Sequence, residues 1–429
     1  MRLRSLIIAM LAPLAILLLA IFIYFLPPVH ERLSWRLHNV QIEIKRALNP
    51  PEQAIFVPKE EQHQIDLIVQ ETLDALTPSP TPAFTPTIPG PTPSPMPTPT
   101  VTPSPTPLPT RVNLTGVVHE YQKFNFCGPA NLSMALSYWG WKGTQMDTGA
   151  YLRPGKYDKN VMPYEMVNYV QAKTDFHALM RVGGNLILLK QFLAAGFPVI
   201  LEKGLYWHDD WLGHYALVTG YDDESEQLIT QDSLIMPDYP VPYKEIEARW
   251  RDFNFVYVVV FPPDREKNVL AILGPQSDVD YNNQYTSDLA AQEASSLTGV
   301  DQYFALFNLG SSRVALEDYP GAAEAFDQAF AVYATLQEGE RPWRVTWYRE
   351  EPYAAYYYTD RYQDVIDLAN NTFFALGEYT LEESFYWRGL AHEGLGMMNE
   401  AIFDLRKAVE LNPNYEPPRQ ALERLGVDN

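Results

Sequence analysis

The sequence predicts a multidomain chain with an N-terminal transmembrane helix, a central α+β domain and a C-terminal all-α repeat domain. Three observations predict this. The chain opens with an uncharged apolar run, its middle mixes strand and helix patterns, and its last third has helical periodicity with an internal repeat. A length of 429 residues also exceeds that of one ordinary domain. The predicted segments are 1–30, 31–76, 77–110, 111–263, 264–299 and 300–429.

Composition excludes several classes of function. A formal net charge of −21 with no basic stripe argues against nucleic-acid binding through phosphate contacts. The single cysteine, Cys127, allows no intramolecular disulfide, so packing alone must hold the folded domains together. The sequence contains no phosphate-binding glycine loop or dinucleotide fingerprint, and we therefore expect no nucleotide or redox cofactor.

The first element is the run from Leu6 to Leu26, which carries no charge and is long enough to cross a hydrocarbon core of roughly 30 Å. A cleavable signal peptide is the alternative, but its apolar region is usually shorter and ends in small residues. Arg2 and Arg4 favour a cytoplasmic N-terminus, although four basic residues between 32 and 46 oppose that orientation. We expect a single-pass membrane protein whose folded domains are extracytoplasmic.

Two segments separate this anchor from the middle domain. Residues 31–76 mix charges with spaced apolar residues, suit short amphipathic helices and carry no motif. Residues 77–110 are almost entirely proline, threonine and serine, which favour extended polyproline II. The tract is expected to be a stiff spacer that holds the next domain up to about 100 Å from the bilayer.

The middle segment, 111–263, alternates helical and strand patterns. Helical spacing and runs of branched and aromatic residues together indicate an α+β domain. Helices are expected at 131–139 and 186–195, and strands at 198–201, 214–221, 227–231 and 255–261.

Cys127 lies where the first of these helices begins. A thiol at a helix N-terminus meets the positive end of the helix dipole and free backbone N–H groups, which favour the reactive thiolate. Gly128 allows close approach of a substrate backbone, and Pro129 suits a first helical turn. Gln122 lies five residues upstream, and its amide with the N–H of Cys127 would form an oxyanion hole.

His214 and Asp232 complete the pattern. His214 opens the predicted strand 214–221, and Asp232 follows the strand 227–231. Antiparallel pairing of these strands through a turn near 222–226 would bring the carboxylate to the imidazole, where it fixes the tautomer. Nucleophile, base and orienting residue can therefore meet in one cleft.

These residues resemble the bacteriocin-processing, double-glycine-leader peptidase-like family of the papain-like superfamily. The matched features are Gln122 followed by Cys127-Gly128-Pro129-Ala130, then His214 with YALVTGYDD behind it, and Asp232 at a strand end. The resemblance implies a papain-like α+β cysteine peptidase domain with Gln122 in the oxyanion hole. Ser233 stands where many relatives have proline after the aspartate, which is a departure from the family pattern.

Alternatives remain for several polar residues. Asn125 is a possible replacement for Gln122 as the oxyanion donor, and Cys127 as an inert core thiol is the simplest competing interpretation. The sequence YWHDDW, with His208, Asp209 and Asp210, invites a metal site but lacks the spaced ligands of a zinc centre. A solvated loop near the cleft mouth is the preferred interpretation, and no metal is expected.

The last segment contains an internal repeat. Gly310, Ala322, Phe326 and Ala329 have the same mutual spacing as Gly389, Ala401, Leu405 and Ala408, which are followed by Pro413. These positions resemble the tetratricopeptide repeat, which implies stacked helical hairpins and a surface for a protein or peptide partner. A weaker middle unit, YQDVIDLANNTFFAL, requires an insertion near Trp343. An ordinary helical cap on the middle domain is the alternative.

The function expected from these motifs is thiol hydrolysis of a peptide or amide bond, with Cys127, His214, Asp232 and Gln122 as site residues. The partners are then a peptide or protein substrate, a protein on the repeats, and the membrane. Two other functions stay open. An inactive domain would act with the repeats as a surface interaction module, and an acyltransferase would use the same residue types with an amine acceptor.

Overall fold

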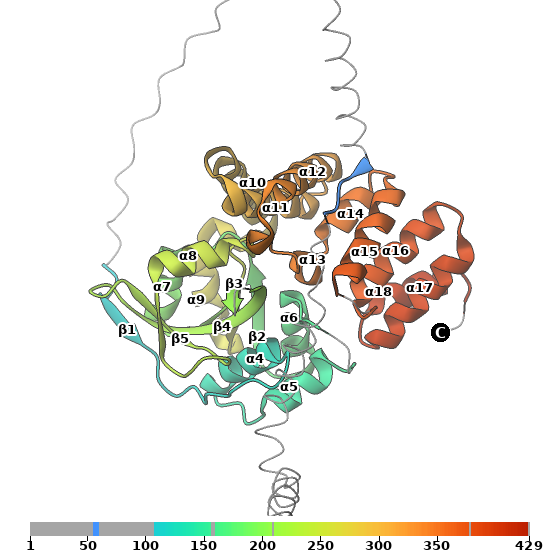
Figure 1. Ribbon diagram of the computed structural model, residues 1–429. Helices are drawn as coiled ribbons and strands as arrows, with labels where there is room; N and C mark the ends of the chain where they lie inside the picture. Colours follow the sequence, from blue (N-terminus) through green and yellow to red (C-terminus); the bar gives the residue numbers. More distant parts are fainter. Residues whose placement is uncertain (1–54, 60–106, 156–158, 208–209, 377–378, 428–429) are drawn as a thin grey trace, which may run out of the picture.

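The computed structural model describes residues 55–59, 107–155, 159–207, 210–376 and 379–427. A sheet domain with helices on both faces is followed by an array of helices that packs beside it (Figure 1). The predicted anchor and almost the whole proline-rich tract lie outside these residues. Within the described ranges, no helix has the length and apolarity needed to span a bilayer.

The sheet is antiparallel at every described pairing and has the order β2-β7-β3-β4-β5-β6, with β1 joined to the far end of β4. Its longest strand, β4, pairs along most of its length with β3, so the two form the centre of the sheet. The strands are β1 (Arg111–Asn113), β2 (His177–Arg181), β3 (Val199–Trp207), β4 (Asp210–Asp222), β5 (Gln227–Gln231), β6 (Tyr239–Pro242) and β7 (Tyr257–Phe261).

Helices cover both faces of the sheet. Because alternate strand residues point to opposite sides, neighbouring residues of one strand pack against different helices. Ile200 and Leu217 pack with α4, α5 and α6, whereas Val199 and Val218 pack with α7, α8 and α9. The helices of this domain are α4 (Cys127–Tyr138), α5 (Gln145–Leu152), α6 (Pro163–Lys173), α7 (Leu186–Ala194), α8 (Tyr243–Arg251) and α9 (Glu266–Leu273). The α+β prediction is confirmed.

The predicted strands and helices of the middle segment are all present. The position of His214 differs from the prediction that it opens the strand. Because β4 begins at Asp210, His214 lies inside the strand. Sequence patterns did not reveal α5, α6, α8, β2 or β6. These are short elements, and in α5 the buried positions Gln145, Thr148 and Gly149 are polar or small, so its helical period does not appear as a pattern of apolar residues.

The connection predicted at 264–299, a polar segment with some helical potential, is largely helical. Residues 266–273 form α9, and residues 279–296 form α10, which packs against α11 of the repeat region. The later helices are α10 (Val279–Ser296), α11 (Gly299–Ala315), α12 (Tyr319–Thr335), α13 (Val345–Tyr348), α14 (Glu351–Tyr357), α15 (Tyr362–Leu376), α16 (Glu382–Gly394), α17 (Met398–Leu411) and α18 (Glu416–Arg424).

The small residues of the repeats lie where paired helices approach closely, as predicted. A Cβ placed on Gly310 would stand 2.6 Å from two carbons of the Phe326 ring, and one on Gly389 would stand 3.1 Å from Leu405 Cγ. Ala401 is fully buried. The predicted insertion is also present, since residues 336–350 contain the one-turn helix α13 between the first and second helical pairs.

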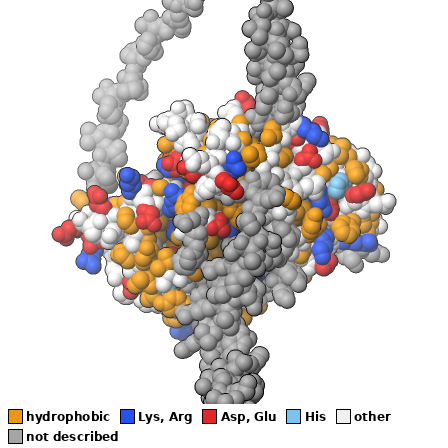
Figure 2. Space-filling view, viewed as in Figure 1, with side chains coloured by type: hydrophobic (Ala, Val, Ile, Leu, Met, Phe, Trp, Pro, Cys, Tyr) orange, Lys and Arg blue, Asp and Glu red, His pale blue; other side chains and the backbone are white. Residues whose placement is uncertain are grey.

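The two domains share a hydrophobic core. Trp211 of β4 stacks on Phe253 with ring centroids 5.7 Å apart and lies 5.5 Å from the Phe304 ring of α11. Helix α13 lies between the sheet and the later helices (Figure 1). On the face shown in Figure 2, acidic and basic side chains are interspersed over both domains.

Candidate active site

Cys127 is the first residue of α4 and is half-buried. Asn125, two residues earlier, has φ of 55°, a left-handed conformation that asparagine tolerates better than most residues and that turns the chain into the helix. The buried amide of Asn131 holds this helix end in place. Its Nδ2 donates to the carbonyls of Cys127 at 2.9 Å and Tyr215 at 2.8 Å, which ties α4 to β4.

The pairing of β4 with β5 brings His214 and Asp232 together, although they are 18 residues apart. Strand β5 ends at Gln231 opposite Leu217, so the chain after it passes the next residues of β4. The His214 Nε2 and Asp232 Oδ1 atoms are 2.9 Å apart, and both side chains are 1% exposed. Asp232 Oδ1 also accepts from the backbone N–H groups of Leu234 and Ile235, which fixes the carboxylate.

The imidazole of His214 therefore stands between a carboxylate and a thiol. Because Nε2 bonds to Asp232, Nδ1 is the nitrogen left to bond to the thiol of Cys127. Burial alone would raise the pKa of Cys127. The hydrogen bond and charge of His214, with the N–H groups of Tyr215 and Gly128, outweigh burial and leave that pKa below its ordinary value.

The pKa values of His214 and Asp232 are shifted so that the imidazole and the carboxyl group are both charged at neutral pH. Burial would lower the pKa of His214, but the charge and hydrogen bond of Asp232 and the bond to Cys127 raise it to about 9. Burial would raise the pKa of Asp232, but the charge and hydrogen bond of His214, and the charge of Lys203, hold it far below its usual range. At neutral pH this arrangement favours thiolate, imidazolium and carboxylate together.

Gln122 is joined to the same site through Ser233. The Ser233 hydroxyl donates to Gln122 Oε1 at 2.8 Å, and the Gln122 N–H donates to the Ser233 carbonyl at 2.8 Å. Asn131 Nδ2 lies 3.2 Å from the same hydroxyl, so Ser233 is fixed as well. With Oε1 bonded to Ser233, the donor nitrogen is the end of the Gln122 amide that faces away from this contact.

Sequence reasoning treated Ser233 only as a departure from the family pattern and missed its contacts. Two further residues were also missed. Lys203 of β3 lies opposite His214 in register and is 5% exposed, where its charge helps to keep Asp232 ionised. The sequence signal that could have revealed Lys203 was a Glu-Lys pair inside an otherwise apolar strand.

Tyr348 was missed because it belongs to the repeat region. A Cβ on Gly213 would stand 3.0 Å from two carbons of the Tyr348 ring, so the ring lies directly on β4 beside His214. Burial raises the pKa of Tyr348 to about 12, the charge of Arg344 opposes the rise, and the negative charge of Cys127 adds to it. Helix α13 thus places an aromatic ring against the strand that carries His214.

The sequence YWHDDW is only partly described, since His208 and Asp209 lie outside the described residues. Asp210 bonds to the repeat region, accepting from Trp343 Nε1 at 2.9 Å and pairing with Arg344. It is therefore a domain contact rather than a solvated loop residue. Among the described residues, no group of three or more His, Cys, Asp or Glu side chains is placed to hold a metal ion.

Two family models match parts of this chain. Residues 114–258 match the model of the Peptidase_C39 like family, and residues 382–415 match the tetratricopeptide repeat. No curated protein matches the chain. A crystal structure from Bacillus anthracis, assigned as a C39-like peptidase, is 16% identical, covers 35% of this chain and 96% of its own, and has a TM-score of 0.29. Residues 114–258 are thus similar to the Peptidase_C39 like family, and residues 382–415 are similar to the tetratricopeptide repeat.

Proposed function

We propose that the central domain is a cysteine peptidase that hydrolyses a peptide or amide bond with Cys127 as nucleophile, His214 as base and Asp232 as orienting residue. The observation that carries the proposal is the continuous contact from the thiol through the imidazole to the buried carboxylate. The family match of residues 114–258 supports the same reaction class.

The geometry suits the following sequence of steps. The Cys127 thiolate attacks the carbonyl carbon while His214 holds the proton. The tetrahedral oxyanion accepts hydrogen bonds from the N–H of Cys127 and from Gln122 Nε2. His214 then protonates the leaving amine, which departs and leaves an acyl-enzyme thioester. Water attacks the thioester as His214 takes its proton, and release of the acid restores the thiolate and imidazolium.

The test uses the full chain in detergent with a peptide library analysed by mass spectrometry. Cys127→Ala should abolish cleavage, and His214→Ala should be nearly as severe, because each removes a group that takes part in bond making. If Cys127→Ala cleaves as well as the wild type, the domain is not a thiol peptidase and the surface interaction module is the better interpretation. An amine added to the reaction separates acyl transfer from hydrolysis, since only transfer gives an amide product.

We also propose that the uncharged run from Leu6 to Leu26 anchors the chain and that both folded domains are extracytoplasmic. The length and apolarity of that run support the proposal. The protein should stay with membranes after carbonate washing, and its domains should be open to protease added to intact cells. Release into the medium with a new N-terminus near residue 27 would contradict the anchor.

A protein partner for the repeats is the remaining part of the proposal. The repeat match supports it, and Phe403 of α17 is 64% exposed on the helix pair that the match covers. Affinity capture with the wild type and with Phe403→Ser should differ in the proteins retained. If both chains retain the same proteins, the surface around Phe403 does not bind the partner.

A further inference from the structure

A short segment far upstream of the peptidase domain lies on the repeat region. Residues 55–59, Ile-Phe-Val-Pro-Lys, lie beside α14 (Figure 1). Their side chains alternate, with Phe56 and Pro58 buried and Ile55, Val57 and Lys59 exposed. This period of two is that of an extended chain with one face on a surface.

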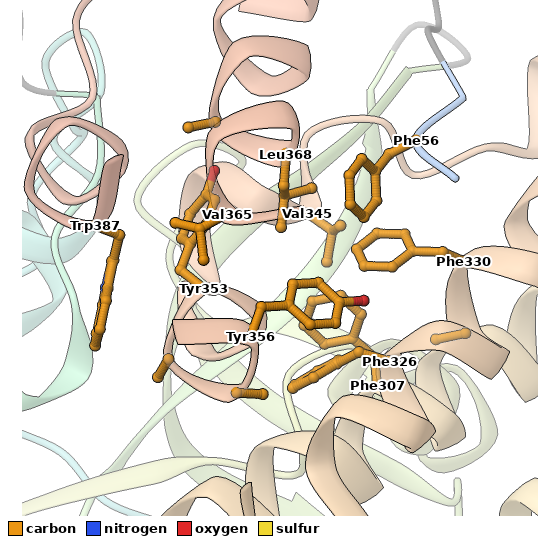
Figure 3. Packing of buried hydrophobic residues seen from close by; sticks show 14 of the residues in the cluster. Phe56, Phe307, Phe326, Phe330, Val345, Tyr353, Tyr356, Val365, Leu368 and Trp387 are labelled. Carbon is orange, nitrogen blue, oxygen red and sulfur yellow. The ribbon is translucent and has the colours of Figure 1, made fainter. Parts of the chain in front are cut away.

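The aromatic contact is the centre of this docking. The Phe56 ring meets Phe330 of α12 edge-on, with centroids 5.0 Å apart, and lies 6.2 Å from the ring of Tyr356 in α14. Phe56 is 6% exposed and belongs to the same core cluster as the repeat helices. Figure 3 shows it directed toward Phe330, among residues of α12, α13, α14 and α15.

Two carboxylates of α15 recognise the end of the segment. The Lys59 backbone N–H donates to Asp364 Oδ1 at 2.9 Å, and Lys59 Nζ lies 3.4 Å from Asp367 Oδ2. Asp364 is held in turn by Arg361 Nε at 2.8 Å, and Arg361 also binds Asp327 of α12. The surface that holds the segment, here called the groove, is formed by Phe330, Tyr356, Asp364 and Asp367, which all belong to the repeat helices.

We propose that this groove is a recognition site for an extended aromatic-x-x-lysine peptide and that residues 55–59 are its ligand within the same chain. Residues 60–106 lie outside the described residues, and the chain on either side of them is then attached to one folded body, by the docked segment at one end and by β1 at the other. If the segment docks in this way, residues 27–54 and not the proline-rich tract set the distance from the proposed anchor to the folded body. That consequence rests on the proposed anchor, whereas the docking itself does not.

Docking also reduces the number of residues that separate the proposed anchor from the folded domains. Without it, residues 27–106 would separate the two, a contour length of up to about 270 Å. With it, only residues 27–54 separate them, or up to about 95 Å at full extension.

Cleavage after Lys59 by a lysine-specific protease tests the docking. Residues 60–110 contain no lysine or arginine, so the fragment is unambiguous. The full chain with Cys127→Ala is used, which removes any self-cleavage and keeps the result independent of the proposed peptidase. Phe56→Ala should speed this cleavage by about tenfold or more, because it removes most of the buried apolar area of the segment.

Val57→Ala is the matched control, since Val57 is 42% exposed in the same segment, and its rate should stay within about twofold of the parent. Phe330→Leu alters the groove and leaves the cleaved sequence intact, so it should also speed cleavage while the melting temperature of the chain shows that the repeats are folded. Equal rates for the parent and Phe56→Ala, or equal acceleration by Val57→Ala, would overturn the docking.

Recognition is tested with a fluorescent peptide of residues 53–61. It should bind the Phe56→Ala chain, whose groove is vacant, more tightly than the parent chain, whose groove is filled. The same peptide with alanine in place of phenylalanine should bind neither. Equal binding of both peptides, or no binding of either at millimolar concentration, would refute a recognition site for free peptides.

Discussion

The proposed ion pair predicts how Asp232→Asn changes the reactivity of Cys127. Asparagine has nearly the same shape and keeps an oxygen that can accept the backbone N–H groups of Leu234 and Ile235. The substitution therefore removes the negative charge beside His214 without removing the acceptor that shapes the loop. The change in thiol reactivity reports the charge alone.

The magnitude follows from the contributions to each pKa. Asp232 is the largest influence that raises the pKa of His214, and burial opposes it, so without the carboxylate this pKa should fall from about 9 to below its ordinary value. The imidazole is then mostly neutral at pH 7 to 8. Cys127 loses the cation that offsets its burial, and its pKa should rise above the ordinary value. An ordinary thiol with a pKa of about 8.5 is only about 0.3% thiolate at pH 6.

Alkylation of Cys127 by iodoacetamide between pH 5 and 10 measures this without a substrate, because the chain has no other cysteine. The wild type should alkylate at pH 6 at least about tenfold faster than an ordinary thiol, and Asp232→Asn should alkylate no faster than one. Asp238→Asn is the matched control, since Asp238 bonds to Gln231 in the next loop. Superimposable profiles for the wild type and Asp232→Asn would refute the ion pair.

Three further outcomes are expected. Ser233→Ala should lower kcat about fivefold, because it removes one neutral hydrogen bond that orients the Gln122 amide. Gln122→Ala should lower kcat by a factor of about 10²–10³. The rate of thiol alkylation should be unchanged in both variants. Ala401→Phe should overpack a helix pair and lower the free energy of unfolding by about 1–3 kcal/mol in denaturant titration. Arg349→Met should lower it by about 2–4 kcal/mol, because it leaves Asn308 and Ser311 without their buried guanidinium partner. Unchanged values would count against the contact concerned.

Local patterns were sufficient for the elements that hold the candidate site. Apolar periodicity placed a helix near Cys127 and strands around His214 and before Asp232, and a short turn between two strands dictates antiparallel pairing. The 18-residue separation of the imidazole and carboxylate is within the reach of one hairpin. For this reason the sequence could predict that they meet.

Contacts between distant segments could not be predicted in the same way. Ser233 bonds to Gln122, 111 residues away, and nothing in the local sequence distinguishes that serine from a turn residue. Phe56 lies in a stretch without a motif, and its environment comes from helices almost 300 residues later. Such contacts depend on how the domains pack, which hydrophobic periodicity does not encode.

The packing of α13 bears on how the two domains should be studied. Trp343 bonds to Asp210, Tyr348 lies on Gly213, and Arg349 Nη1 lies 3.3 Å from the carbonyl of Asp252. Two of these contacts are on β4, the strand that carries His214, and the third is at the end of α8, beside Trp211. Removing the repeats would expose Trp211, which is 1% exposed in the intact chain, and would leave the start of β4 without its cover. The repeats are therefore a structural part of the candidate site, and residues 111–263 alone should not retain its geometry.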